Sequence, residues 1–302
     1  MCTQLSTPGE YADLLDKFDT FMFDCDGVLW SGDHLIGGVI EALHLLRSKG
    51  KNILFVTNNA TKSRKSYKKK FDGFGIEAHV EEIFGSAYAA AVYISTVVKL
   101  PKDKKVYVIG MSGVEEELHN EGVSYIGGTD PADTTFEPFD LKNFTPDPDV
   151  SVVLCGLDTN INYTKLSKAF RYLHTNPECL FIATNEDSTF PSTGGILPGA
   201  GSISAPLRYA LGRDPVCTGK PSQSMLDCIQ AKVHFDPKRT IMIGDRLNTD
   251  ILFGKAGGVS TLLVLTGVTA KEEVLAPGAT PIAVPDYMTQ SIGDFAVLAT
   301  PN

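Results

Sequence analysis

Short apolar runs alternate with amphipathic segments along most of this chain, and the alternation predicts the fold class. The run at residues 18–23, interrupted only by two polar residues, has the length of a buried parallel strand. Residues 37–49 then place apolar side chains at helical spacing, and residues 52–57 form a second short apolar run. Strand, helix and strand in this order predict a parallel, doubly wound sheet, so we expect an α/β protein.

The same alternation continues to the end of the chain. Further strands are expected at residues 83–86, 105–110, 123–126, 151–156, 180–184, 240–243 and 260–265. Further helices are expected at residues 11–18, 63–74, 87–98, 114–121, 163–174, 202–211, 225–233, 249–256 and 292–298. The Pro- and Asp-rich stretch 130–149 predicts a long loop or a hairpin, and the Gly- and Pro-rich stretch 191–201 predicts a connection.

The alternation restarts after residue 100 and resumes its first form near residue 214, which indicates an inserted unit. With 302 residues, the chain is too long for one small core, so two domains are the natural expectation. We expect a discontinuous core domain at residues 1–100 and 214–302. An α/β domain at residues 101–213 is expected to be inserted into it.

Composition excludes several classes of protein. The formal net charge of -9 argues against a nucleic-acid binder, which usually presents a basic face. The six cysteines are scattered without a C-x-x-C pair, which favours free thiols in a reducing compartment. The first residues carry no apolar signal segment, and no apolar run is long enough to cross a bilayer. We therefore expect a soluble, cytoplasmic protein that binds neither nucleic acid nor membrane.

Two carboxylates follow the first predicted strand. Asp24 and Asp26 are separated by Cys25 and followed by Gly27. An extended backbone points both aspartates to the same side, and ligands of open α/β sheets bind just beyond the carboxyl ends of strands. Two close carboxylates repel each other unless a cation or a shared proton intervenes. A magnesium ion, which prefers oxygen ligands, meets that need.

Other predicted strand ends also carry polar residues: Thr57-Asn58-Asn59, Lys220, and Asp245 with Asp250. If these strands are neighbours, all the groups surround one point. We expect Asp24, Asp26 through its side chain or its backbone carbonyl, and Asp245 to hold Mg²⁺, and we favour the backbone carbonyl for Asp26. Asp250 is expected to orient a metal-bound water as a more distant member of the same site.

The remaining strand-end residues suit a phosphoryl group. Lys220 supplies a positive charge, and Thr57 with the backbone amides of Asn58 and Asn59 supplies hydrogen-bond donors. Asp24 is then a candidate nucleophile that needs no activating base, because an ordinary aspartate is ionised at pH 7. In this scheme Asp26 protonates the departing oxygen and later removes a proton from the hydrolytic water.

These motifs resemble those of the haloacid dehalogenase (HAD) superfamily of phosphatases over nearly the whole chain. Asp24-x-Asp26-Gly-Val resembles the first motif, Thr57-Asn58 the second, Lys220 the third, and Gly244-Asp245 with Asp250 the fourth. Further stretches resemble the branch that contains eukaryotic phosphoglycolate and pyridoxal phosphate phosphatases and fungal 4-nitrophenyl phosphatases; they are 26–30, 57–59, 197–201 and 218–221. The resemblance implies a Rossmann-like core, an inserted C2-type α/β cap, magnesium, a phosphoaspartate intermediate and often homodimers formed through the caps.

The expected reaction is the hydrolysis of small phosphate monoesters, with 2-phosphoglycolate the leading substrate and 4-nitrophenyl phosphate a suitable assay compound. Pyridoxal phosphate, a sugar phosphate or a phosphoprotein remain open as substrates. A receiver-like phosphoaspartate signalling module is a rival, but Asp26 and the inserted domain disfavour it because a receiver is one small domain. A phosphomutase or phosphotransferase, in which a second substrate replaces water, also remains open.

Three other features of the sequence have simple structural interpretations beside their functional ones. The lysines at 68–70, with Arg64 and Lys65, are expected to form a solvated helix face rather than a polyanion site. Cys25 is expected to be a packed thiol, although its two acidic neighbours leave a regulatory oxidation open. Residues 185–188 follow a strand of the inserted domain. They either reach the leaving group or form an ordinary surface turn.

Overall fold

The computed structural model describes residues 2–134, 138–192, 194–275 and 284–298. By their internal contacts, the residues divide into two compact units. Unit 1 comprises Met1–Thr57, Lys68–Phe84 and Lys220–Asn302, and unit 2 comprises Asn58–Tyr67 and Gly85–Gly219. Each unit has a parallel sheet of its own, so the predicted α/β class is confirmed.

Over the described residues, unit 1 is built on a seven-stranded sheet in the order β1-β16-β15-β14-β2-β5-β6. Its strands are β1 (Thr3–Gln4), β2 (Thr20–Phe23), β5 (Asn52–Thr57), β6 (Ile83–Gly85), β14 (Thr240–Gly244), β15 (Ser260–Val264) and β16 (Tyr287–Thr289). Neighbouring strands from β1 through β5 in this order run parallel. The sequence order reverses at β2, which lies between β14 and β5. This reversal is the point at which doubly wound sheets bind their ligands.

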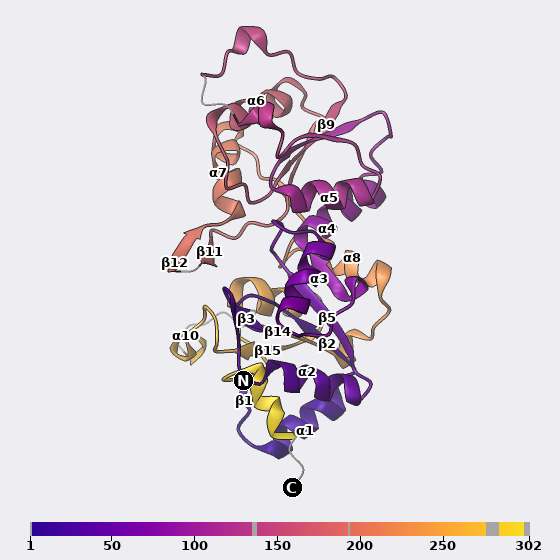
Figure 1. The fold of residues 1–302 in the computed structure, drawn as a ribbon, viewed down its shortest axis with the longest axis vertical. Helices are drawn as coiled ribbons and strands as arrows, with labels where there is room; N and C mark the ends of the chain where they lie inside the picture. The colour runs from indigo at the N-terminus through magenta and orange to yellow at the C-terminus, as the bar shows by residue number, and fades with distance from the viewer. Residues whose placement is uncertain (1, 135–137, 193, 276–283, 299–302) are drawn as a thin grey trace. The chain divides into compact units, whose positions relative to one another are not determined.

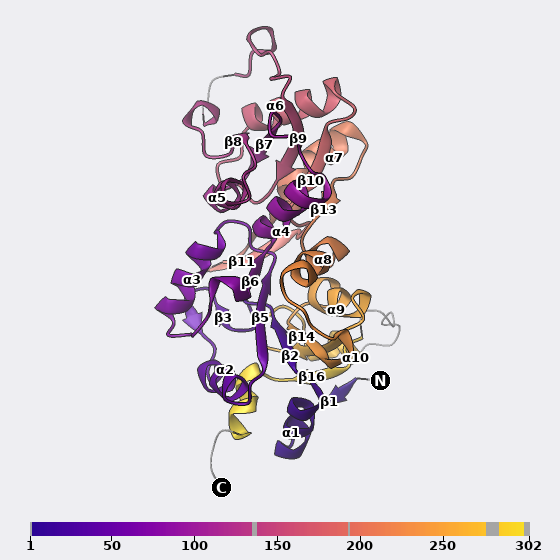
Figure 2. The ribbon, with the colours of Figure 1, turned by 90° about the vertical axis from the view of Figure 1, so that its right-hand side faces the viewer.

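Strand β2 is buried along its whole length, and its composition explains why. All four residues from Thr20 to Phe23 are buried, because hydrogen-bonded strands flank β2 on both edges and helices lie on both sides of the sheet (Figure 2). A strand covered on both faces shows a continuous apolar run rather than alternation. The ladder continues for one residue beyond β2, since the Asp24 N–H donates to the Ile243 carbonyl at 2.8 Å. The backbone of Asp24 is therefore fixed at the carboxyl edge of the sheet.

Helices lie on both sides of this sheet. They are α1 (Pro8–Lys17), α2 (Val39–Ser48), α8 (Gln223–Lys232), α9 (Leu252–Ala256) and α10 (Lys271–Leu275), with α3 (Arg64–Gly73) shared between the units. Shorter helical turns are η1 (Val80–Glu82), η5 (Pro237–Arg239), η6 (Leu247–Ile251) and η8 (Ile292–Leu298). Figure 2 shows α2 on one side of β2 and β5 and α9 on the other side of the sheet. No helix of the described chain is both long and apolar enough to span a membrane.

Unit 2 is built on a five-stranded parallel sheet in the order β13-β10-β9-β7-β8, over the residues that the structure describes. Its strands are β7 (Lys105–Ile109), β8 (Tyr125–Gly127), β9 (Val150–Cys155), β10 (Leu180–Ala183) and β13 (Val216–Cys217). Its helices are α4 (Ser86–Val92), which continues as η2 (Tyr93–Val97), α5 (Ser112–Asn120), α6 (Tyr163–Thr175) and α7 (Ala200–Leu211).

Alternate residues of one central strand show how unit 2 builds two cores. Val106 and Val108 of β7 join the cluster that includes residues of α4 and α5. Tyr107 and Ile109 join the opposite cluster, which includes residues of α6 and α7. Since successive side chains of a strand point to opposite faces, the sheet is covered on both sides. In Figure 1, α6 and α7 lie on one side of β9 and α5 on the other.

Two stretches differ from a simple strand-helix reading. The Gly- and Pro-rich stretch at 191–201, expected as a connection, contains most of an antiparallel hairpin formed by β11 (Thr189–Ser192) and β12 (Gly195–Pro198). A second small hairpin pairs β3 (Trp30–Ser31) with β4 (His34–Leu35). In the stretch 130–149, the described residues form the turns η3 (Pro131–Asp133) and η4 (Leu141–Asn143). They contain no hairpin, and residues 135–137 lie outside the described part.

The limits of the two units do not coincide with the expected limits at 100/101 and 213/214. Helix α4 and its extension η2 pack their alanines and Ile94 against β7 and β9, so residues 85–100 group with unit 2. Strand β13 pairs with β10 through Val216 and Cys217, so residues 214–219 group with unit 2 as well. Both segments therefore belong by contact to the inserted sheet rather than to the sheet of β2.

Candidate active site

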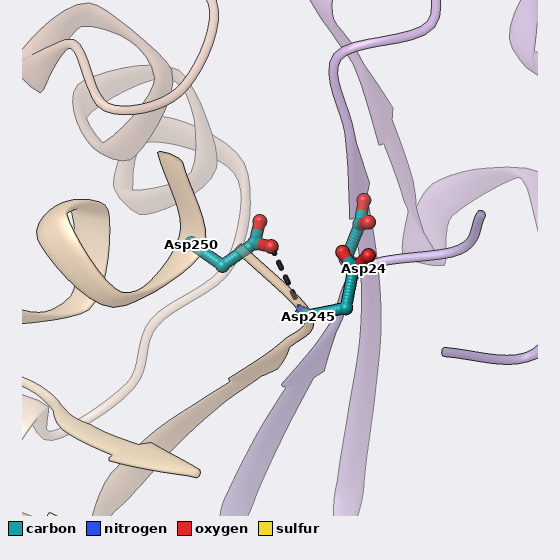
Figure 3. Close-up of side chains that lie close together, drawn as sticks. All are labelled: Asp24, Asp245 and Asp250. Atoms are coloured by element: carbon teal, nitrogen blue, oxygen red, sulfur yellow. Dashed lines mark hydrogen bonds between the residues drawn. The ribbon is translucent and has the colours of Figure 1, made fainter. Parts of the chain in front are cut away.

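Three carboxylates meet at the carboxyl edge of the unit 1 sheet. Asp24 follows β2, Asp245 follows β14, and Asp250 lies in the helical turn η6 just beyond (Figure 3). One oxygen from each carboxylate lies within 4.8 Å of the other two. Strands β2 and β14 are direct neighbours, so chain segments more than 200 residues apart converge on one point.

Lys220 lies at the centre of this group. Its side chain is 2% exposed, and its ammonium donates to Asp24 Oδ1 at 2.8 Å and to Asp250 Oδ1 at 2.7 Å. It also donates to the Val56 carbonyl at 2.7 Å. The three bonds tie the ends of β2, β5 and η6 to a single cation.

Asp250 has both carboxylate oxygens engaged. Oδ1 accepts from Lys220, and Oδ2 accepts from the backbone N–H groups of Asp245 and Arg246 at 3.2 and 3.1 Å. Gly244 leaves room for this arrangement, because a Cβ there would lie 2.1 Å from the Cβ of Asp250. Asp250 therefore orients the turn after β14 through Oδ2 and holds the Lys220 ammonium through Oδ1.

Asp245 is held differently. Its Oδ2 accepts from the Val268 N–H at 2.7 Å, while its Oδ1 is buried and has no hydrogen-bond partner among the described residues. Gly27 and Gly267 line the carboxylate so closely that a Cβ would lie 2.6 and 1.9 Å from Oδ2. A buried carboxylate oxygen normally has a partner, and an oxygen-preferring cation supplies one.

The charges in this cluster are unbalanced. One ammonium faces three carboxylates, of which Asp245 and Asp250 are buried and Asp24 is partly buried. Burial raises the pKa of Asp24 well above its usual range, and Asp250 and Asp245 raise it further while Lys220 lowers it. Burial and Asp250 raise the pKa of Asp245 to about 7. The setting of Asp24 thus differs from that of an ordinary exposed aspartate, and its role as an ionised nucleophile stays a prediction that depends on a bound cation.

Lys220 stays protonated in the same setting. Burial alone would lower the pKa of this ammonium, but the carboxylates of Asp24 and Asp250 outweigh burial and raise the pKa above its ordinary value. The site thus keeps one permanent positive charge beside its carboxylates.

Asp26 lies two residues beyond Asp24, and its side chain contacts a different set of residues. Its Oδ1 accepts from the indole N–H of Trp30 at 2.8 Å, and the ammonium of Lys70 lies 3.5 Å from the same oxygen. The expectation that lysines 68–70 form a solvated face is therefore wrong for Lys70. Helical spacing carried the missing signal, because Lys70 lies three positions after the buried Tyr67 of α3 and four before Phe74, which directly follows the helix.

The second predicted motif is divided between the units. Thr57 is buried at the end of β5 in unit 1, whereas Asn58 and Asn59 group with unit 2. There the Asn58 amide donates to both carboxylate oxygens of Asp187 at 3.2 Å, and the Asn58 carbonyl accepts from the Asn185 amide at 2.7 Å. Residues 185 and 187 thus contact Asn58, and whether the stretch 185–188 reaches the leaving group stays a prediction.

Cys25 is buried between the two aspartates. Burial raises the pKa of its thiol well above the usual range, and Asp24 and Asp26 raise it further. A thiol of this kind is a poor nucleophile, because thiolate is the reactive form. This agrees with a packed side chain.

Comparison with known proteins identifies the family. The Haloacid dehalogenase-like hydrolase model matches residues 21–124, and a HAD-hydrolase-like model matches residues 217–294. The chain is 50% identical over 301 residues to the 4-nitrophenylphosphatase of Schizosaccharomyces pombe, covering 99% of this chain and 100% of that protein. The chain belongs to the haloacid dehalogenase-like hydrolases. The predicted family is thereby confirmed.

Other members of this hydrolase family agree. Phosphoglycolate phosphatase 2 of Arabidopsis thaliana is 45% identical over 300 residues, or 99% of each chain. Among solved structures, the p-nitrophenyl phosphatase of Archaeoglobus fulgidus matches with a TM-score of 0.78 and 30% identity, covering 93% of this chain and 99% of that one. A glycerol phosphate phosphatase of Mycobacterium tuberculosis in complex with magnesium matches with a TM-score of 0.78 and 28% identity, covering 94% and 78%. By this kinship the chain is an enzyme of the phosphoric monoester hydrolase class.

Proposed function

We propose that the protein hydrolyses small phosphate monoesters in a magnesium-dependent reaction through an aspartyl phosphate on Asp24. The cluster of Asp24, Asp245, Asp250 and Lys220 is the observation that carries this proposal. The relatives named for 4-nitrophenyl phosphate and phosphoglycolate support the substrate class. We take 2-phosphoglycolate as the leading physiological candidate.

The residues present fit a magnesium ion. Asp24, Asp245 and the backbone carbonyl of Asp26 would hold it, with the unpartnered Oδ1 of Asp245 as the strongest indication within the described chain. The excess of carboxylates over ammonium groups calls for a cation of charge two. Asp250 would support the site indirectly, because it holds Lys220 and the turn after β14 in place. When bound, the ion supplies charge that offsets the repulsion between Asp24 and the phosphate.

The proposed chemistry uses two aspartates in different roles. Asp24 attacks phosphorus, so that an O–P bond forms to its carboxylate while the bond from phosphorus to the leaving oxygen breaks. Asp26 gives a proton to the departing oxygen. Asp26 then takes a proton from the water that attacks the aspartyl phosphate, which releases inorganic phosphate and restores Asp24. Asp26 thus ends the cycle with the proton it began with.

We assign phosphate binding to Lys220 and to the residues at the end of β5. Lys220 offers a positive charge that its buried carboxylate neighbours maintain. Thr57 at the end of β5, with the backbone amides of Asn58 and Asn59, supplies donors for the phosphate oxygens. Donors held in place by a rigid sheet stabilise the charge that develops in the transition state.

Unit 1 is proposed as the catalytic core and unit 2 as the C2-type cap. The cap is proposed to set specificity, with Asn185 and Asp187 acting through their bonds to Asn58. We also propose a homodimer formed through unit 2. A dimer mass in light scattering at micromolar concentration would support this, and a monomer mass would exclude it. The six free cysteines accord with a cytoplasmic location.

The test is steady-state release of phosphate from a panel of esters. We expect turnover of 4-nitrophenyl phosphate and 2-phosphoglycolate in the presence of Mg²⁺, and none in excess EDTA. Pyridoxal phosphate and glycerol 3-phosphate in the same panel rank the alternative substrates, the latter because a 39%-identical relative is named glycerol-3-phosphate phosphatase.

The variant Asp24→Asn tests the nucleophile. We expect kcat to fall by at least about 10³-fold, because an amide cannot form the covalent intermediate. Asp13→Asn, an exposed aspartate on α1, is the matched control and should retain activity. Retained turnover in Asp24→Asn would refute the assignment, and a single burst of phosphorylation without turnover in the wild type would favour a signalling module.

A further inference from the structure

The carboxylate of Asp26 is held by two donors that act on one oxygen. The indole N–H of Trp30 donates to Oδ1 at 2.8 Å, and the Lys70 ammonium lies 3.5 Å from the same atom. Two donors on one oxygen define the rotation of a carboxyl group about its last bond, because turning the group would break both contacts.

Helix α3 holds both donors in place. Trp30 is fully buried, with its ring 5.0 Å from Phe71 at 73° and 5.4 Å from Phe74 at 23°. The Lys70 ammonium lies 4.3 Å from the centre of the same indole ring. Such a cation over an aromatic face is favourable. Lys70 and Phe71 belong to the last turn of α3, and Phe74 directly follows the helix, which lies beside β3 in Figures 1 and 2.

The backbone around Asp26 is fixed separately. The Gly27 N–H donates to the Trp30 carbonyl at 2.7 Å, and the Leu29 N–H donates to the Cys25 carbonyl at 2.8 Å. The loop after β2 is thereby closed on itself. Its backbone sets where the Asp26 side chain begins, and the two donors set the direction in which its carboxyl group faces.

We propose that Lys70 is a positioning residue that, together with Trp30, orients the Asp26 carboxyl group for proton exchange with the leaving oxygen. This role rests on the proposed function of Asp26. The Lys70 and Asp26 side chains are 20% and 30% exposed, so the group is held by the protein while it remains open to substrate and water. Lys70 itself contacts neither phosphate nor metal in this proposal.

Two substrates that differ in leaving group test the proposal. An alkyl phosphate such as 2-phosphoglycolate needs a proton on its departing oxygen, whereas 4-nitrophenolate leaves readily as an anion. We expect Lys70→Met to lower kcat/KM for the alkyl phosphate about tenfold and for 4-nitrophenyl phosphate less than about twofold, since general acid catalysis matters only where the leaving group is poor. Lys70→Arg should recover most of the loss, because its guanidinium keeps the charge and stacks on aromatic rings.

Lys68→Met is the matched control. Lys68 lies on the same helix and pairs with Asp72 one turn away, so this variant removes the same charge and an ion pair without touching Asp26. We expect it to leave the ratio of the two kcat/KM values unchanged. Equal shifts in Lys68→Met and Lys70→Met would overturn the proposal, and so would a ratio in Lys70→Met within twofold of the wild type.

The single tryptophan of the chain gives a readout that does not depend on activity. Because Lys70 lies over the indole ring, Lys70→Met should change the position or intensity of tryptophan emission, and Lys68→Met should not. Unchanged emission in Lys70→Met would show that the contact is absent and would overturn the proposal. A wild-type enzyme that hydrolyses neither ester would remove the proposed function itself. Full activity with an unchanged leaving-group ratio would remove only the role of Lys70.

Discussion

Both units of the molecule bury charged side chains, but they balance the charges differently. In unit 2, Lys165 and Asp158 form an ion pair at 2.7 Å, and each side chain is 2% exposed. Asp133 is likewise buried, and it contacts Lys168 and the hydroxyl of Tyr107. In unit 1, by contrast, Lys220 faces Asp24, Asp245 and Asp250 together.

The difference distinguishes buried charges that are balanced within the protein from buried charges that need a bound cation to balance them. A buried pair with matched charges satisfies itself, and removing one partner leaves the other uncompensated. A buried cluster with excess negative charge is satisfied only when a cation arrives. The buried ion pairs of unit 2 therefore stabilise its fold. Unit 1 instead keeps an excess of negative charge at the carboxyl edge of its sheet.

The largest expected effect comes from removing part of this excess negative charge. Asp245→Asn takes away one excess negative charge and a proposed metal ligand, so we expect kcat/KM to fall by about 10⁴-fold, or about 5.5 kcal/mol. Stability without Mg²⁺ at pH 7.5 should be equal to or higher than that of the wild type, because repulsion among the carboxylates is relieved. Phosphate release and thermal unfolding measure the two quantities. A variant that loses stability along with activity would contradict the comparison.

The next effect concerns the matched pair of unit 2. Lys165→Met leaves Asp158 buried without its cation, which should lower the free energy of unfolding by about 3–5 kcal/mol. The urea midpoint followed by circular dichroism measures the loss. The double variant Asp158→Leu/Lys165→Met should regain most of it, since no buried charge then remains. A loss below about 1 kcal/mol in the single variant would make this pair no different from a surface ion pair.

A smaller effect links Mg²⁺, pH and stability. The pKa of Asp245 is raised to about 7, mainly by burial, whereas an unfolded aspartate ionises near about 4. Between these values the native state binds a proton that the unfolded state has lost, so this carboxyl makes stability fall as pH rises. Because Mg²⁺ binds the ionised form, its stabilising effect should grow over the same range.

At pH 7.5, about 10 mM Mg²⁺ should raise Tm by about 2–4 °C, and at pH 5.5 the rise should be clearly smaller. Differential scanning fluorimetry at both pH values, with and without the ion, measures the shift. Asp245→Asn is the control and should show little shift at either pH. Equal shifts at the two pH values would indicate that the ion binds elsewhere.

The sequence predicted the main residues of the site because they lie at the ends of strands. Asp24 and Asp245 each follow a short apolar strand, and a parallel sheet brings the carboxyl ends of its strands to one edge. Lys220 is different, because the strand before it, β13, belongs to the sheet of unit 2, and its place in the site is known from its bond to Asp24. This argument needs no knowledge of side-chain contacts. It gives positions, but it does not give ionisation, and so it missed the raised pKa of Asp24.

Residues whose environment depends on distant partners were not predicted. Asp133 lies in a stretch expected to be a loop, and its burial follows from Tyr107 and Lys168, which are far away in the chain. Lys70 belongs to a run of three lysines, which usually indicates an exposed helix face. It differs from the other two because its ammonium lies over the ring of Trp30. The attachment of α4 to unit 2 likewise depends on the sheet against which its alanines pack.

The strand order of unit 1 also bears on synthesis of the chain. Strand β2 is synthesised early, but its neighbour β14 is synthesised more than 200 residues later. The interval between β1 and its partner β16 is longer still. At ordinary ribosomal speeds, β2 spends on the order of 10 to 40 s without one of its two partners. During that interval, an apolar strand edge that the finished protein hides completely is open to chaperones or to aggregation.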